Sequence, residues 1–165
     1  MKFKITLKMN REHGDLLPFN YQYEQSAVIY RILAQADTQY SSWLHENGYL
    51  LHERKRFKLF CYSPFIFDKV KPLPEAGCLK IIGERAVWYI SFIPEKSTLE
   101  FIQGIFAHQS FTIGNKKYQV AFDVVGVEAI PMPQLTEEMT FKALSPICVK
   151  LHEDNKTQYL SPDNP

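Results

Sequence analysis

Three polar side chains, Tyr30, His45 and Lys58, stand beside apolar patterns that do not bury them. An imidazole titrates close to neutral pH, so His45 is a candidate for proton transfer. An ammonium group such as that of Lys58 can stabilise negative charge that develops during a reaction. A lone surface histidine is usually only solvated, so these residue types form a site only if the fold brings them together.

Two consecutive helices are predicted to carry the first two of these side chains. Residues 24–36 contain an apolar stripe at helical spacing, and Tyr30 flanks that stripe, about 100° around the helix from its neighbour. Asp37 predicts the N-cap of a second, short helix, and Gly48 predicts its C-terminal end. The core-facing residues of the two helices are expected to be Ile29, Ile32, Leu33, Ala36, Tyr40, Trp43 and Leu44. His45 then lies on the opposite side, in the last turn, where the helix dipole favours a cation.

The third side chain falls in residues 57–63, which are predicted as one strand after the basic residues 54–56. In such a strand Lys58, Phe60 and Tyr62 share one face. The opposite face carries Phe57, Leu59 and Cys61. A lysine in a strand is normally an edge or solvent residue, which is the alternative to a chemical role for Lys58.

Two further segments have the alternation of strands. Residues 2–9 alternate between apolar and polar side chains, which predicts a half-buried strand with a basic outer face. Residues 116–130 alternate as far as Val124, and the alternation then slips by one residue beside Gly126. One extra residue in a long strand is the pattern of a β-bulge.

A hairpin and a further helix are predicted between these two strands. Residues 79–82 and 86–93 are apolar runs on either side of a short polar turn, which is typical of a hairpin. Ser97 with Glu100 three residues later matches the capping box that starts a helix. The inward-facing residues of that helix are expected to be Leu99, Ile102, Ile105 and Phe106.

The order of these elements is strand, helix pair, strand, strand, helix, strand. This is the βαββαβ order of a ferredoxin-like α+β domain, with an antiparallel sheet and helices on one face. We assign residues 1–132 to this domain. Residues 133–165 are expected to form a connecting hairpin from the strand-like runs 139–144 and 147–151.

Composition limits the class of protein. Hydrophobic residues make up 45% of the 165 residues, which indicates a packed globular chain. The formal charge of +1 is nearly balanced, so affinity for nucleic acid must come from local clusters. The odd set of cysteines, Cys61, Cys78 and Cys148, argues against a disulfide framework or a zinc site. No apolar run approaches about 20 residues, so we expect a soluble, cytoplasmic protein that does not enter a membrane.

A set of short motifs, in order along most of the chain, resembles the CRISPR repeat-RNA-processing endoribonuclease family of the RAMP superfamily. The motifs are Leu17-Pro18-Phe19-Asn20-Tyr21-Gln22-Tyr23, Ile29-Tyr30, Trp43-Leu44-His45, Phe57-Lys58-Leu59-Phe60-Cys61-Tyr62-Ser63 and Leu144-Ser145-Pro146-Ile147. Each motif alone is weak, and their order carries the resemblance.

The resemblance implies cleavage of precursor CRISPR RNA within its repeats, without a metal or another cofactor. The 2′-hydroxyl attacks the adjacent phosphate and leaves a 2′,3′-cyclic phosphate and a 5′-hydroxyl. Some family members use a tyrosine, a histidine and a lysine at the positions of Tyr30, His45 and Lys58. His45 is then the general acid, or the base in the alternative assignment, Lys58 stabilises charge on the phosphorane, and Tyr30 contacts the 2′-hydroxyl. His52 is a second candidate for the histidine.

Five basic residues are candidates for holding RNA phosphates, namely Arg54, Lys55, Arg56, Lys69 and Lys71. Such contacts give affinity that depends on salt and hardly on sequence. The alternative interpretation is a solvated loop. The partner that these residues imply is CRISPR repeat RNA, with an effector complex or a second copy of the chain as further expected partners.

Family members usually continue into a second ferredoxin-like domain with a Gly-rich segment. The seven glycines of this chain are scattered, so residues 133–165 are expected to be the start of a missing second domain. We therefore expect the isolated chain to cleave RNA poorly. The alternative function is a non-catalytic RNA-binding or assembly subunit of a CRISPR ribonucleoprotein complex.

Overall fold

The computed structural model describes residues 1–51, 55–140, 149–153 and 156–160. Contacts divide the chain into two compact units, Met1–Met132 and Pro133–Pro165. The second unit contains β12 (Val149–Glu153) and β13 (Lys156–Leu160), which pair antiparallel. Of the two strand-like runs expected there, residues 141–148 lie outside the described residues. None of the described helices is both long and apolar enough to span a membrane.

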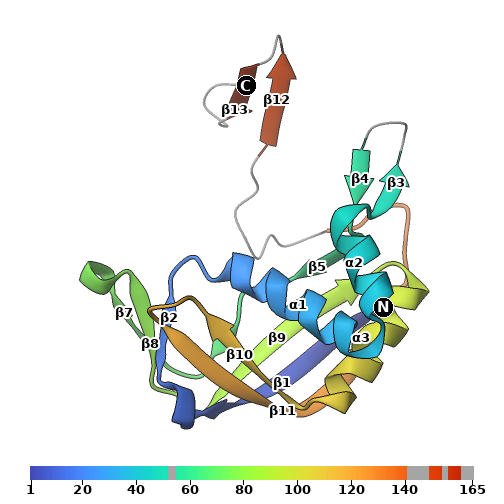
Figure 1. Ribbon diagram of the computed structural model, residues 1–165. Coiled ribbons are helices and arrows are strands. Elements are labelled where there is room, and N and C mark those ends of the chain that lie inside the picture. The colour runs from blue at the N-terminus through green and yellow to red at the C-terminus, as the bar shows by residue number, and fades with distance from the viewer. Residues whose placement is uncertain (52–54, 141–148, 154–155, 161–165) are drawn as a thin grey trace. The chain divides into compact units, whose positions relative to one another are not determined.

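The first unit is organised around an antiparallel sheet with the strand order β10-β11-β1-β9-β5 (Figure 1). Its strands are β1 (Lys2–Asn10), β5 (Phe60–Tyr62), β9 (Arg85–Phe92), β10 (Ser110–Gly114) and β11 (Gln119–Ile130), and β6 (Ile66–Phe67) also pairs with β9. The helices are α1 (Gln22–Ala36), α2 (Thr38–Glu46) and α3 (Glu95–Ala107). The connection β1-α1-α2-β5-β9-α3-β11, with β1 and β9 central, confirms the predicted ferredoxin-like fold. β10 adds one edge strand.

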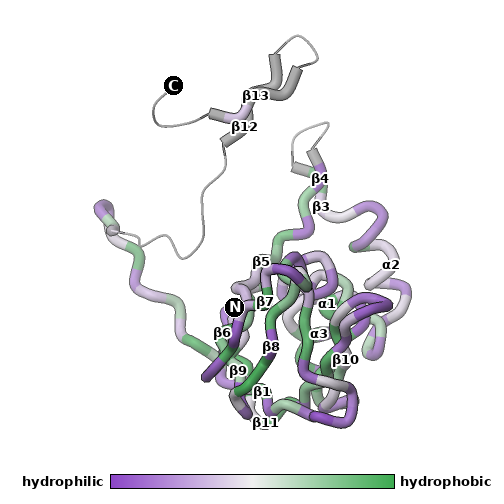
Figure 2. Tube along the Cα trace, turned by 90° about the vertical axis from the view of Figure 1, so that its left-hand side faces the viewer, coloured by the Kyte–Doolittle hydropathy of each residue, from purple (hydrophilic) through white to green (hydrophobic). Residues whose placement is uncertain are grey.

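The core lies between the sheet and the helices that cover one of its faces. The alternation predicted for β1 is confirmed, because Phe3, Ile5, Leu7 and Met9 are all buried. The neighbouring strand contributes Ala86, Trp88, Ile90 and Phe92, and the helices contribute Val28, Ile29, Ile32, Leu33, Phe101 and Ile105. Figure 2 shows hydrophobic stretches along the strands and α3, with hydrophilic residues at several turns. The bulge is also confirmed, since Thr6 pairs with Gly126 and Leu7 with Val124.

The predicted strand over residues 57–63 is interrupted. Leu59 has φ +55, in the left-handed region, which ends the extended conformation there. Before it, β4 (Lys55–Phe57) pairs with β3 (Tyr49–Leu51), and after it β5 pairs with β9. The prediction of one continuous strand was therefore wrong. Cys61, in β5, is exposed.

The predicted hairpin over residues 79–93 was wrong as well, because its two strands belong to different sheets. β8 (Cys78–Ile81) pairs with β2 (Leu16–Pro18) and β7 (Val70–Leu73) in a three-stranded sheet. Two 3-10 turns accompany this sheet, η1 (Arg11–His13) and η2 (Pro74–Ala76). The Arg11 guanidinium donates to the carbonyl oxygens of Ile82 and Gly83 and pairs with Glu84 at 2.9 Å. These contacts tie the segment between β8 and β9 to η1.

Both ends of α2 follow the prediction. The Asp37 carboxylate accepts a hydrogen bond from the Tyr40 N–H at 2.8 Å, and Gly48 has φ +68 after the last turn. Tyr40 and Leu44 are buried as expected, but Trp43 is 40% exposed. The Trp43 ring contacts Tyr49 of β3, with 5.1 Å between the ring centroids, instead of the core.

The start of α3 differs from the prediction. The helix begins at Glu95 with Pro94 as its N-cap, so Ser97 lies inside the first turn and is buried. Its hydroxyl forms a hydrogen bond with the Tyr40 hydroxyl instead of capping the helix. Ile105 is buried as predicted, and Phe101, which was not among the residues expected to face inward, is buried as well. Two of the residues expected to face inward, Leu99 and Phe106, are more than half exposed.

Candidate active site

Tyr30 and His45 come from consecutive helices and their rings are in contact. Their ring centroids are 5.0 Å apart and the planes stand at 82°, an edge-to-face arrangement. The two helices are joined at Asp37, which ends α1 and caps α2. The Ser41 hydroxyl adds a second link, because it donates to the Tyr30 carbonyl oxygen at 2.8 Å. The relative position of the two rings is therefore fixed by the helix junction.

Lys58 joins the same place from the chain between β4 and β5. Its ammonium group donates to the backbone carbonyl oxygens of Leu44 and His45. These carbonyls belong to the last turn of α2, where the helix dipole attracts a positive charge. An ammonium has three N–H donors, so one donor is left after these two bonds. We call the three residues Tyr30, His45 and Lys58 the cleavage cluster, after the role that the family resemblance implies for them.

Aromatic side chains of β5 pack beside the cleavage cluster and support it. The Phe60 ring meets the Tyr30 ring edge-on, with the centroids 5.8 Å apart. Tyr62 stacks beside Phe60 at 6.3 Å, and its hydroxyl donates to the Gln22 carbonyl oxygen at 2.8 Å. This bond ties β5 to the first turn of α1. Phe60 and Tyr62 were not predicted as supports from the sequence. Residues 57–63 were predicted as one strand, whereas the strand is broken at Leu59.

The environment sets the protonation of two members of the cleavage cluster. Burial, helped by the nearby Tyr62, raises the pKa of Tyr30, so this phenol stays protonated at neutral pH. Burial, helped by the nearby Arg56 charge, lowers the pKa of Lys58. The Tyr30 hydroxyl has no hydrogen-bond partner among the residues that the structure describes. It is thus available as a donor to a ligand.

The cluster opens to solvent. His45 is exposed, and Tyr30 and Lys58 are half-buried at the edge of the helix layer. A polar ligand can therefore reach all three side chains. A phenol, an imidazole and an ammonium at one surface can donate protons, accept a proton and stabilise an anion.

Comparison with known proteins places the chain in a family. The family described as "CRISPR-associated protein Cas6, N-terminal" matches residues 16–122, which include the whole cleavage cluster. The chain belongs to the Cas6 family. Its predicted resemblance to CRISPR-associated RNA-processing proteins is thereby confirmed.

Relatives of this Cas6 chain are longer than it is. The CRISPR-associated endoribonuclease Cas6 1 of Methanocaldococcus jannaschii is 27% identical, over 98% of this chain and 59% of that relative. A solved structure described as "An RAMP protein binding different RNA substrates" is 26% identical with a TM-score of 0.71, over 99% of this chain and 64% of that one. Another, from "Characterization of a Cas6-related gene from Pyrococcus furiosus", is 25% identical with a TM-score of 0.73, over 98% and 62%. This chain therefore spans less than two thirds of their lengths.

The basic residues predicted to bind RNA do not form one patch in this Cas6 chain. Arg56 is exposed on β4, next to the cleavage cluster, and donates to the Asn47 side chain at 3.0 Å. Lys55 begins β4. Lys69 and Lys71 are exposed around the start of β7, which lies at the other end of the first unit from β3 and β4 (Figure 1). Arg54 and the alternative histidine, His52, fall outside the described residues.

Proposed function

We propose that this chain carries the cleavage site of a metal-independent endoribonuclease that cuts precursor CRISPR RNA within its repeats. The observation that supports it is the contact between the Tyr30 and His45 rings, with the Lys58 ammonium bound to the backbone of the same turn. Three groups from separate segments at one open surface match the needs of in-line attack on a phosphodiester.

The reaction transfers two protons. The 2′-hydroxyl loses its proton to a base as its oxygen bonds to the adjacent phosphorus, and the bond from phosphorus to the 5′-oxygen breaks. The leaving 5′-oxygen takes a proton from an acid, which leaves a 2′,3′-cyclic phosphate and a 5′-hydroxyl. His45 is the general acid of this scheme, and solvent water then takes the 2′ proton. In the alternative assignment His45 is the base, and the leaving 5′-oxygen takes its proton from water.

The other two members of the cleavage cluster act on charge and position. The remaining N–H donor of Lys58 and its positive charge stabilise the oxygens of the phosphorane. Since Tyr30 stays a phenol at neutral pH, it donates a hydrogen bond that orients the 2′-hydroxyl and does not itself take up the proton. Each acid–base group should contribute about 100- to 10,000-fold in rate.

RNA is the partner that this function requires. Arg56 would hold a phosphate beside the cleavage cluster, and Lys69 and Lys71 would hold a separate part of the strand. Arg54 and Lys55 stay predicted phosphate contacts. Such contacts predict affinity that falls steeply as salt rises. An effector complex, a second copy of the chain and a cytoplasmic location stay predictions.

The decisive test is cleavage of a repeat RNA by His45→Asn, which removes proton transfer and keeps the size of the side chain. We expect the rate in EDTA to fall by about 100-fold or more, while the affinity for the RNA stays within about twofold. Glu46→Ala is the matched control, because Glu46 is exposed in the same last turn of α2. Product ends are identified by their 2′,3′-cyclic phosphate.

Two results would reject the proposal. Equal cleavage rates for His45→Asn and the parent chain would remove His45 from the chemistry. Cleavage that stops in EDTA and returns with a divalent cation would contradict the metal-independent scheme.

Binding of RNA without cleavage is the second candidate function. The observation that favours it is that two of the three N–H donors of Lys58 are already bound to carbonyls of α2. It predicts retained RNA affinity and no cyclic phosphate product, and it therefore differs from the first proposal in the same assay.

A further inference from the structure

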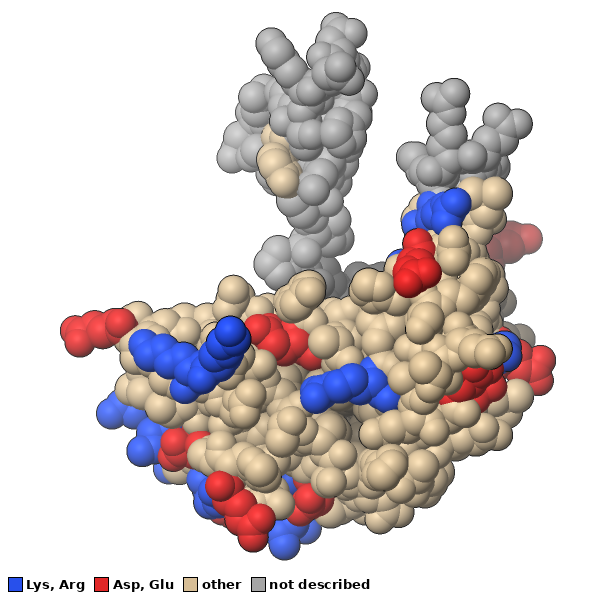
Figure 3. Space-filling view, in the orientation of Figure 1, with Lys and Arg blue, Asp and Glu red and all other residues tan. Residues whose placement is uncertain are grey.

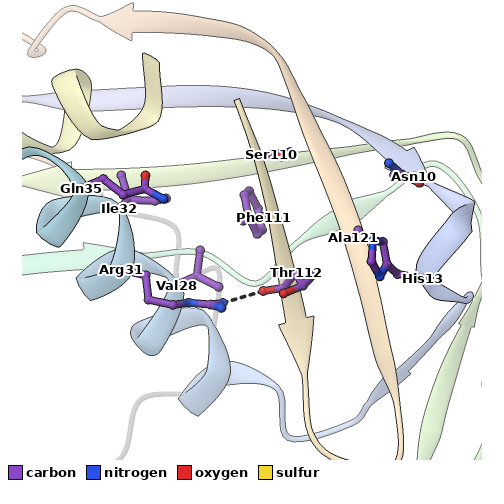
Figure 4. Close-up of a pocket in the computed structure, with 10 residues that line it drawn as sticks. All are labelled: Asn10, His13, Val28, Arg31, Ile32, Gln35, Ser110, Phe111, Thr112 and Ala121. Carbon is purple, nitrogen blue, oxygen red and sulfur yellow. Dashed lines mark hydrogen bonds between the residues drawn. The ribbon is translucent and has the colours of Figure 1, made fainter. Parts of the chain in front are cut away.

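A second surface lies on the other flank of α1 from the cleavage cluster. It is a cavity of about 300 Å³ between α1, β10, β11 and the η1 turn (Figure 4). Its floor is apolar, because the half-buried Phe111 lines it together with the core residues Val28 and Ile32. We call it the β10 pocket.

The rim of the β10 pocket is polar and positive. Arg31 and Gln35 reach over it from successive turns of α1, and His13 faces them from the opposite side (Figure 4). The Arg31 guanidinium donates one N–H to the Thr112 carbonyl oxygen, which leaves four of its five donors. Within the part of the chain that the structure describes, no carboxylate pairs with Arg31. An anion can therefore bind this side chain without displacing an ion pair.

The hydrogen bond between Arg31 and the Thr112 carbonyl argues against a peptide that would bind as an added strand. β10 is an edge strand, and an added strand would need its outward-facing carbonyl groups. Arg31 already occupies the Thr112 carbonyl on that edge. The features of the β10 pocket that are available to a ligand are an apolar floor and the cationic and amide donors around it. These features fit a flat, partly apolar ring that is linked to a phosphate.

Positive charge continues beside the β10 pocket. A neighbouring hollow shares His13 with it and is also lined by Lys116 and Lys117, at the turn between β10 and β11. The Asn115 side chain accepts from the backbone N–H groups of Lys117 and Tyr118, both at 2.9 Å, which orders this turn. Figure 3 shows Lys and Arg side chains over α1 and over this end of the hairpin.

One carboxylate also lines this neighbouring hollow. It belongs to Asp15, which lies 3.6 Å from the Lys80 ammonium. Its charge is therefore partly balanced, and the two lysines of the turn can hold a second phosphate.

We propose that the β10 pocket binds one unstacked nucleotide of the RNA, with its base on the apolar floor and its phosphate on Arg31. The inference rests on the proposed function, because it takes RNA as the ligand. Arg31 follows Tyr30 directly, so the two side chains diverge by about 100° around α1. A single strand that crosses α1 would then reach the cleavage cluster on one flank and the β10 pocket on the other.

The test uses anisotropy of a fluorescein-labelled single-stranded RNA of about twelve nucleotides with all four bases, at several salt concentrations. Arg31→Ala should weaken binding at least about fivefold and lower the salt slope by about one. Gln35→Glu keeps the side-chain size, and its carboxylate lies one helical turn from Arg31. It should also weaken binding at least about fivefold, because it pairs with Arg31 and repels the phosphate.

Lys8→Ala is the control for loss of one charge, since Lys8 is exposed on the β1 face that points away from the helices. Its affinity should stay within about twofold of the parent chain. Parent-like affinity in both Arg31→Ala and Gln35→Glu, or an equal loss in Lys8→Ala, would overturn the proposal. Thermal melts show that each variant is folded.

The outcome separates this proposal from the proposed function. If His45→Asn stops cleavage while the two pocket variants bind RNA normally, the β10 pocket is wrong and the cleavage site stands. If the pocket variants lose affinity while His45→Asn cleaves normally, the pocket stands and the cleavage assignment fails.

Discussion

Gly104 of α3 lies against the backbone of α1 at Ile32, so Gly104→Ala tests how α1 is positioned. A Cβ at this position would stand 1.9 Å from the Ile32 carbonyl oxygen and 2.8 Å from its carbonyl carbon. Ordinary contact begins at 3.4 Å, so the two helices would have to separate by about 1.5 Å, the difference between 3.4 and 1.9. Both of these carbonyl atoms are backbone, so no side-chain rotation can relieve the clash.

The cost can be worked out from this geometry. Overpacking costs about 1–3 kcal/mol, and a clash with backbone belongs to the upper end of that range. Alanine regains about 1 kcal/mol in a helix interior relative to glycine. The net loss of unfolding free energy is therefore about 2 kcal/mol, which lowers the Tm by about 4–8 °C in a chain of this length.

The same shift should separate Tyr30 and His45 from the aromatic support on β5. Tyr30 and His45 move together, because Ser41 ties α2 to α1, whereas the Phe60 support stays with the sheet. A misplacement of about 1 Å costs on the order of 100-fold in rate. We expect a loss of that size in Gly104→Ala, measured well below its Tm, where circular dichroism shows the chain to be folded.

Gly126→Ala is the matched control, because it makes the same substitution in β11. The nearest atom to a Cβ there is 3.7 Å away, which is ordinary contact. Its stability should stay within about 0.5 kcal/mol of the parent chain. If Gly104→Ala melts at the parent temperature, the close approach of α1 and α3 is wrong, and so is the reasoning built on it.

Two further predictions concern the ends of α2. Lys58→Met keeps the aliphatic stem but removes the charge at the last turn of α2. It should lower the unfolding free energy, measured in urea, by about 1 kcal/mol and also lower the cleavage rate. Lys8→Met, the control, should change neither. The Tyr40 N–H and then Lys96 lower the pKa of Asp37, so its stabilising effect is present above the ordinary aspartate pKa and is lost as the pH falls below it. The Tm should consequently fall more between about pH 5 and about pH 3 in the parent chain than in Asp37→Asn. Equal pH dependence in the two proteins would show that the cap carboxylate does not carry this effect.

Local patterns predicted much of this fold. The alternation of β1, the Asp37 cap and the slip beside Gly126 are each set by neighbours within a few residues, and all three are present in the structure. The order of elements then left few ways to arrange the sheet, because the connections in such folds follow restrictive rules. The candidate residues Tyr30, His45 and Lys58 came from the family motifs together with their position beside apolar patterns.

The predictions were wrong where one sequence pattern spans residues that have different structural partners. The break at Leu59 and the separation of β8 from β9 arise because each half of an apolar run pairs with a different strand. The shifted start of α3 has the same origin, since the Ser97 hydroxyl bonds to Tyr40 on α2 instead of to its own helix.

The sequence by itself determined the three helical segments, the central strand β1 and both ends of α2, and it identified side chains whose types suit acid–base chemistry. Only the tertiary structure decided that the Lys58 ammonium rests on the last turn of α2 and that His13 faces Arg31 across the β10 pocket. The physical reason is the separation along the chain of the residues that set each property. Periodicity and caps are local properties of the chain, whereas these contacts join residues that become neighbours only once the helices have packed on the sheet.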